Sequence, residues 1–151
     1  MFSWSIKKNG GQKEQALGRS QGDFNKKIHI AVDALGNPLR FILSQGQAHE
    51  SPYALDLIDG LKAEAVIGDK GYDSTKFIQH IEQKQMLAII PPRRSRKDHR
   101  DYDKHRYKER HLVECFLNKI KHYRRIFSRF DKLAKRYLAF IYFVSTLVWL
   151  R

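Results

Sequence analysis

Four residues near the C-terminal end of the chain combine a phenol, two cations and a carboxylate at helical spacing. They are Tyr107, Arg110, Glu114 and Lys121, within the segment YKERHLVECFLNKIK. Steps of three, four and seven residues bring side chains to one side of an α-helix, here within about 60° of one another. This grouping is typical of a functional site. An ordinary solvated face with Arg110 near Glu114 has the same pattern, and spacing alone favours the solvated face.

A second carboxylate follows a short apolar segment. Asp69 comes directly after AVIG, which predicts a buried strand, so the residue lies at or just past the carboxyl end of that strand. Open α/β sheets bind ligands outside that edge. The sequence GDKGYD is also typical of a turn, and position alone favours a turn aspartate.

Alternating strands and helices are expected around these residues. Period-two alternation in KKIHIAVD and the turn sequence GNP predict two strands joined by a turn, and MLAIIPP predicts a further buried strand. Helices are expected from Ser51 to Lys62, around Phe77 to Ile81, from Lys108 onward, and from about Asp131 to Leu150. This alternation predicts the α/β class.

Charge and cysteine content restrict the partners and the compartment. The chain has 29 Lys and Arg against 16 Asp and Glu in 151 residues, a formal charge of +13. Such an excess favours a polyanion, most commonly nucleic acid, over a membrane surface. The single cysteine, Cys115, excludes an internal disulfide and suits a reducing cytoplasm. The start of the chain has no secretory signal, and the apolar run at 137–150 is too short for a membrane span, which needs about 20 residues.

A basic segment supplies candidate phosphate contacts. The candidates for DNA binding are Arg93, Arg94, Arg96, Lys97 and Arg100, with Arg124 and Arg125 further along the chain. A solvated loop is the alternative, but this density of cations favours phosphate contact. The histidines show neither a cysteine partner nor a zinc-binding pattern, so no metal role is assigned to them.

Several of these motifs resemble one known family. YKERHLVECFLNKIK matches the Tyr-x2-Arg-x3-Glu-x6-Lys signature of bacterial insertion-sequence transposases of the DDE type. DALGNPLRFILSQGQAHE, AVIGDKGYD and IIPPRRSRK resemble the insertion-sequence-five family in the same order. The resemblance covers roughly residues 16–150.

The resemblance implies a ribonuclease-H-like fold, a mixed sheet flanked by helices, and a metal-dependent reaction. Members of the family hold two divalent metals, Mg²⁺ or Mn²⁺, with three acidic residues. Asp69 matches the second acid and Glu114 the third. Tyr107, Arg110 and Lys121 match the other signature positions, which are expected to hold the helix in place and touch DNA phosphate.

The resemblance also sets expectations for the sheet. Residues 26–33 should pair antiparallel with residues 39–44. The strand at 65–69 should lie in the same sheet, with the helix of Glu114 packed across it. Residues 26–150 are expected to form the C-terminal portion of the transposase catalytic domain, after a flexible arm at 1–25 that is rich in Gly, Gln and Lys.

The first acid of the family lies on a strand before the Lys-Ile-His hairpin. The segment that precedes this hairpin here contains Glu14 and Asp23 but no apolar strand that ends in Asp. Asp33 matches a hairpin-turn residue and receives no catalytic role. We therefore expect the C-terminal part of a transposase, either the downstream frame of a two-frame element or a decayed remnant. Such a chain should not cleave or join DNA ends alone.

Two other functions share some of these features. One is a non-catalytic nucleic-acid-binding remnant, or an inhibitor of the full-length transposase, whose DNA binding does not depend on Asp69 or Glu114. The other is a basic structural protein of the ribosome-associated type, against which the two acidic motifs argue. For the transposase we expect DNA as the partner, homo-oligomers in the active complex, fusion to an upstream-frame product, and a bacterial cytoplasmic location on the nucleoid.

Overall fold

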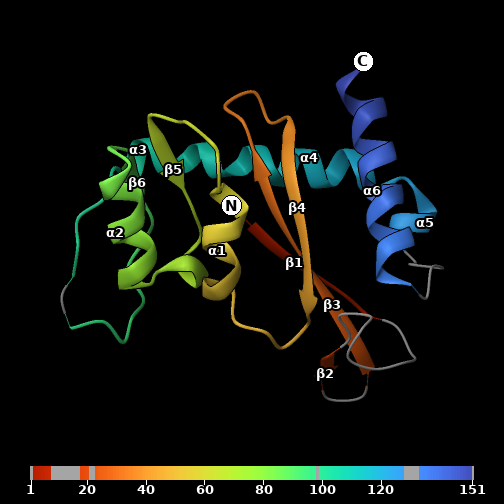
Figure 1. Cartoon of the computed structure of the whole chain (residues 1–151), viewed down its shortest axis with the longest axis horizontal. Coiled ribbons are helices and arrows are strands. Elements are labelled where there is room, and N and C mark those ends of the chain that lie inside the picture. The colour runs from red at the N-terminus through yellow and green to blue at the C-terminus, as the bar shows by residue number, and fades with distance from the viewer. Residues whose placement is uncertain (1, 8–17, 21–22, 98, 128–132, 151) are drawn as a thin grey trace.

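The computed structural model describes residues 2–7, 18–20, 23–97, 99–127 and 133–150, with side-chain surroundings from residue 27 onward except at Phe127. A four-stranded antiparallel sheet forms one half of the molecule (Figure 1). Its strands are β1 (Phe2–Lys7), β2 (Gly18–Ser20), β3 (Asp23–Val32) and β4 (Pro38–Gln45).

Strand β3 is the centre of this sheet. It pairs with β1 along one edge, and with β4 and the short β2 along the other. The predicted hairpin is confirmed, with Lys26 opposite Gln45 and Ala31 opposite Arg40. In the intervening turn, the Asp33 carboxylate accepts hydrogen bonds from backbone amides, in agreement with a turn role.

Regular structure near the N-terminus differs from the expectation. β1 and β2 lie within residues 1–25, for which the composition predicted an arm without strands, and that prediction is wrong for these two segments. Pairing with β3 explains the difference, because a neighbouring strand satisfies backbone groups whatever the side-chain pattern. Glu14 lies outside the described residues, and Asp23 is described only as part of β3.

The strand that precedes Asp69 does not join this sheet. β5 (Ala65–Ile67) pairs in parallel with β6 (Leu87–Ile89) in a separate two-stranded sheet, so the expectation of one sheet is wrong. A cavity of about 490 Å³ lies between the two sheets, lined by residues 31–33 of the hairpin and 65–67 of β5.

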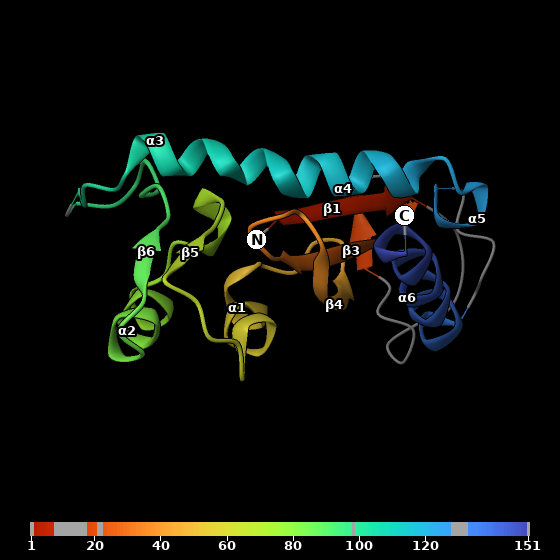
Figure 2. The same cartoon turned by 90° about the horizontal axis from the view of Figure 1, so that it is seen from above.

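One long helical segment spans both sheets. α3 (Lys104–Tyr107), the 3₁₀ turn η3 (Lys108–Arg110) and α4 (His111–Lys121) follow one another without a break, and Figure 2 shows α3 near β6 and α4 alongside β1 and β3. Val113, Phe116, Leu117 and Ile120 are buried against the hairpin and the C-terminal helix. The sequence predicted this apolar face. Because it packs against the core, the opposite face of the helix points away from that core.

The remaining helices complete two cores. α1 (Ser51–Ile58) and α2 (Thr75–Gln83) pack around Tyr72 near β5 and β6, while α5 (Arg124–Phe127) and α6 (Ala134–Trp149) pack on the hairpin side. α1 is shorter than predicted, because Asp59 is extended and Gly60 has a φ of +71°. No helix in the described part of the chain is long and apolar enough to cross a membrane.

Candidate functional site

Asp69 lies just past the carboxyl end of β5, as the sequence predicts. It begins a tight turn in which the Tyr72 amide donates to the Asp69 carbonyl at 2.9 Å, and residues 70–72 form the 3₁₀ turn η2. We call residues 69–73 the Asp69 turn. Its position at a strand end gives the Asp69 carboxylate a rigid support while the side chain stays 35% exposed.

Residues of the long helix reach this carboxylate. The Tyr107 hydroxyl donates a hydrogen bond to Asp69 Oδ1 at 3.2 Å. Arg110 lies one turn further, with Nη1 at 3.8 Å from Asp69 Oδ1 and Nη2 at 2.9 Å from Glu114 Oε1. Both carboxylates therefore contact one guanidinium group, and the two sequence-distant acids lie at one place on the surface.

Lys121 does not join this group. It lies two helical turns beyond Glu114, and its ammonium donates to Asn118 Oδ1 at 2.9 Å on an exposed surface. The structure thus brings together three of the four signature residues.

The electrostatics of the site keep the phenol neutral. Burial raises the pKa of Tyr107 to about 12, the negative charge of Asp69 adds to this rise, and the Arg110 cation opposes it. A neutral phenol is a hydrogen-bond donor, so Tyr107 can orient the Asp69 carboxylate throughout the neutral range of pH.

The donor set fits a divalent metal in type but not in number. Aspartate and glutamate oxygens suit Mg²⁺ and Mn²⁺. Within the described ranges, however, there is no group of three or more His, Cys, Asp or Glu residues that could hold a metal ion. Asp69 and Glu114 can supply part of such a site, and the described residues alone do not complete it.

A family model described as "Transposase DDE domain" matches residues 2–147, nearly the whole chain. The chain belongs to the transposase DDE domain family. A Brucella ovis protein named as a transposase for insertion sequence element IS6501 is 37% identical over 127 residues, which cover 83% of this chain and 98% of that protein. A Burkholderia cepacia protein named for element IS402 is 28% identical, over 76% of this chain and 58% of its own length.

A third relative is a transposase for insertion sequence element IS1106 from Neisseria meningitidis serogroup B. It is 37% identical over 82 residues, 54% of this chain and 25% of that protein. The chain therefore covers little more than half, or less, of these last two proteins. No solved structure matches the chain.

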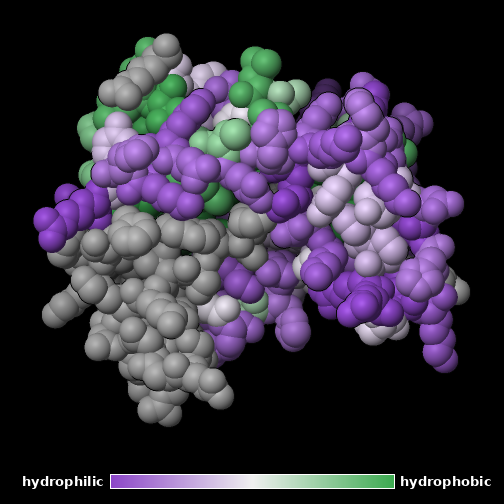
Figure 3. All heavy atoms as spheres, turned by 180° about the vertical axis from the view of Figure 1, so that it is seen from behind, coloured by the Kyte–Doolittle hydropathy of each residue, from purple (hydrophilic) through white to green (hydrophobic). Residues whose placement is uncertain are grey.

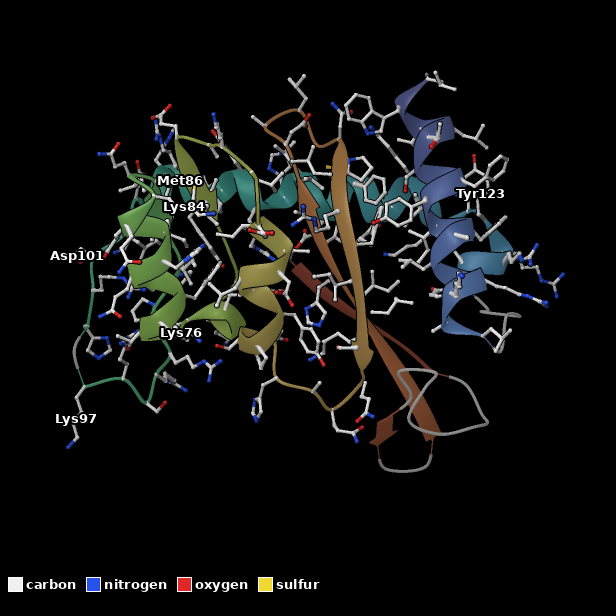
Figure 4. The ribbon with its side chains drawn as sticks, viewed as in Figure 1. Lys76, Lys84, Met86, Lys97, Asp101 and Tyr123 are labelled. Carbon is white, nitrogen blue, oxygen red and sulfur yellow. The ribbon has the colours of Figure 1, made fainter. Side chains whose placement is uncertain are left out.

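The basic segment of this DDE-domain chain is less exposed than its composition suggests. Arg93, Arg96 and Arg100 turn inward, where they contact the Asp69 turn and the start of α2. Arg94 and Lys97 are exposed, and Figure 4 shows the Lys97 side chain pointing away from the ribbon. Arg124 and Arg125 are also exposed, with the Arg125 guanidinium 4.8 Å from the centre of the Phe140 ring.

Buried residues behind the Asp69 turn escaped the sequence analysis. The Tyr72 hydroxyl is hydrogen-bonded to His29 Nδ1 at 2.8 Å, and His29 Nε2 to the Ser44 hydroxyl at 2.8 Å. Burial, with the nearby Lys27 cation, lowers the pKa of His29 to about 4, and burial raises the pKa of Tyr72. The available signal was the alternation in β3, which puts His29 on the face opposite Ile28 and Ile30, but the pattern does not show that both faces are covered.

Asp73 is the second residue that sequence reasoning missed. It ends the Asp69 turn, and its side chain is only 2% exposed. The sequence GDKGYD contains both acids, but only Asp69 directly follows the predicted strand, so the sequence indicated Asp69 alone. A buried carboxylate needs partners, and the inward-facing arginines supply them.

Proposed function

We propose that this chain supplies Asp69 and Glu114 to the divalent-metal site of a DDE transposase that cleaves and joins the DNA ends of an insertion sequence. The observation that carries the proposal is the contact of both carboxylates with the Arg110 guanidinium. We also propose that the chain has a ribonuclease-H-like fold and belongs to the insertion-sequence-five family. The order of motifs supports this assignment, as does the parallel β5–β6 pair next to an antiparallel sheet.

The residues of the site have separate roles in this proposal. A bound Mg²⁺ or Mn²⁺ pair would supply the charge stabilisation that in-line displacement at phosphorus requires. Asp69 and Glu114 offer oxygen ligands from a strand end and a helix, which are rigid supports. The Tyr107 hydroxyl orients Asp69, and Arg110 holds the carboxylates together and can pair with DNA phosphate.

In this proposal, DNA binds to a basic surface of the protein. The face that carries α3 and α4 is mostly hydrophilic where it is described (Figure 3), and Lys121, Arg124 and Arg125 are exposed. With the chain's formal charge of +13, we expect salt-sensitive DNA binding with little sequence preference. Binding that is equally tight at low and high salt would contradict this part of the proposal.

We propose further that the described residues do not supply all the ligands of the metal pair. Two carboxylates leave a metal pair with few protein ligands, and Mg²⁺ gives up its water reluctantly. We therefore expect that the chain alone does not cleave or join DNA ends. A fusion to an upstream-frame product that carries an Asp-ending strand and the end-binding domain should restore the reaction, in a complex that contains several copies.

The test is strand cleavage on a DNA that carries the element's ends. The expected result is no product with the chain alone and Mg²⁺-dependent product with the fusion. A fusion that is folded and DNA-bound but inactive would overturn the proposal that this half is intact.

A second function has a specific observation in its favour. The described residues lack a complete group of three metal ligands, which fits a non-catalytic nucleic-acid-binding remnant or an inhibitor of the full-length transposase. This alternative predicts DNA binding that Asp69→Asn and Glu114→Gln leave unchanged, and no activity in any fusion. The fusion assay therefore separates the two functions.

A further inference from the structure

Arginines of residues 93–100, the basic segment, surround the buried carboxylate of Asp73. Asp73 Oδ2 accepts a hydrogen bond from the Arg93 amide at 2.8 Å. Asp73 Oδ1 forms ion pairs with the Arg96 guanidinium and, at 3.3 Å, with Arg100. The Asp73 side chain is 2% exposed, and those of Arg96 and Arg100 are 22% and 26% exposed. Charges removed from water to this degree are retained only when they are paired, so these contacts bind the segment to the turn.

The same arginines also hold the neighbouring backbone. Arg93 donates from Nη2 to the Gly71 carbonyl at 2.6 Å and from Nε to the Lys70 carbonyl at 3.2 Å. Arg96 donates to Thr75 Oγ1 at 2.7 Å, at the start of α2. Guanidinium groups are suited to this work because several donors lie in one rigid plane.

The opposite side of the turn is equally fixed. Tyr72 is fully buried on His29, and a methyl group at Gly71 would lie 1.9 Å from Glu50 Oε2. Glu50 itself is paired with Lys27 at 3.1 Å. The turn therefore lies between a buried polar network and the arginines, and Asp69 is its first residue.

We propose that Arg93, Arg96 and Arg100 are positioning residues that fix the direction of the Asp69 carboxylate. Arg96 and Arg100 act through Asp73, and Arg93 acts through the carbonyls of Lys70 and Gly71. This inference rests on the proposed function of Asp69. Phosphate contact from residues 93–100 is then left to Arg94 and Lys97, which are exposed and make no hydrogen bond or ion pair with the described residues. The arrangement divides a basic segment that looks uniform in sequence into an internal clamp and an outward DNA contact.

The test follows the Tyr107–Asp69 hydrogen bond in the full chain without metal or DNA. The chain is labelled with 3-fluorotyrosine, and the Tyr107 fluorine resonance is assigned by its loss in Tyr107→Phe. The change of the Tyr107 resonance in Asp69→Asn serves as the reference for an altered contact between Tyr107 and Asp69. Arg96→Gln and Asp73→Asn should move the resonance in the same direction, and Arg96→Lys, which keeps the cation, should restore part of the shift.

The matched controls are Arg94→Gln and Lys97→Gln, which remove the same charge from the same segment. They should leave the Tyr107 resonance unmoved and should each lower the slope of log K against log salt for duplex DNA by up to about 0.9. The variants of the internal clamp, Arg96→Gln and Asp73→Asn, should leave that slope unchanged. Far-ultraviolet circular dichroism confirms folding, and Arg100→Gln replaces any variant that does not fold.

Two results would overturn the inference. One is an unmoved Tyr107 resonance in folded Arg96→Gln or Arg100→Gln. The other is a loss of salt slope in the clamp variants equal to that in Arg94→Gln. Because neither measurement depends on catalysis, the positioning role can fail while the transposase function stands, and the reverse is also true.

Discussion

Asp69 and Glu114, one after a strand and one on a helix, contact the two terminal nitrogens of the same guanidinium. Arg110 lies 3.8 Å from Asp69 and 2.9 Å from Glu114. A cation between two carboxylates relieves their repulsion and keeps them close in the absence of metal. A divalent metal that binds both acids must replace or complement this cation.

The two carboxylates should be essential for chemistry and dispensable for DNA binding. In an active fusion, Asp69→Asn or Glu114→Gln should abolish strand cleavage, because an amide is a poor ligand for Mg²⁺. Duplex binding should remain within about twofold, since neither change removes a cation. Glu109→Gln, on the exposed surface of η3, is the matched control and should keep activity. Full activity of Asp69→Asn would show that the ligand assignment is wrong.

The Tyr107 hydroxyl should contribute measurably to stability. Tyr107→Phe removes the donor to Asp69 and should lower the free energy of unfolding by about 1 kcal/mol in urea titrations. Tyr102→Phe is the control, because the Tyr102 ring packs edge-on against Tyr107 and its hydroxyl makes no hydrogen bond with the described residues. Equal losses in the two variants would contradict a specific role for the Tyr107–Asp69 bond.

Stability should fall in acid through His29. Its pKa is about 4 in the folded protein against 6.5 for an ordinary histidine, so the unfolded chain binds the proton more tightly. The contribution of His29 is therefore fully present above about pH 6.5 and is lost as the pH falls towards 4, by at most about 1.4 kcal/mol per pH unit.

The measurement is the free energy of unfolding at pH 7 and pH 5 for the native chain and for His29→Gln. The difference between the two pH values should shrink in His29→Gln, since the buried titrating group is gone. His49→Gln removes an exposed histidine and should keep the native pH dependence. An unchanged pH dependence in folded His29→Gln would refute this origin of acid sensitivity.

Removal of the buried carboxylate should be costly. Asp73→Ala leaves the partly buried Arg96 and Arg100 guanidinium groups without their anion and should lower the free energy of unfolding by about 3 kcal/mol. Asp101→Ala, at an exposed position of the following loop that is labelled in Figure 4, should change it by no more than about 0.5 kcal/mol. Similar small losses in both variants would show that the Asp73 ion pairs contribute little.

The sequence by itself determined the local elements. Period-two alternation and turn residues gave the β3–β4 hairpin, and the helical period gave the buried face of α4 with Phe116 and Leu117 inside. These features depend on neighbours within a few residues, whose side chains alternate or stack whatever the rest of the fold does. The same spacing predicted that Arg110 and Glu114 share a face, and their ion pair has that geometry.

Tertiary structure decided which charges are buried and which strands pair. Nothing in GDKGYD distinguishes the partly exposed Asp69 from the buried Asp73, and nothing in RRSRK distinguishes the inward Arg96 from the outward Arg94. The separation of β5 from the main sheet was likewise invisible in sequence. The physical reason is that desolvation and long-range pairing are set by groups distant in the chain, whose approach a local pattern does not encode.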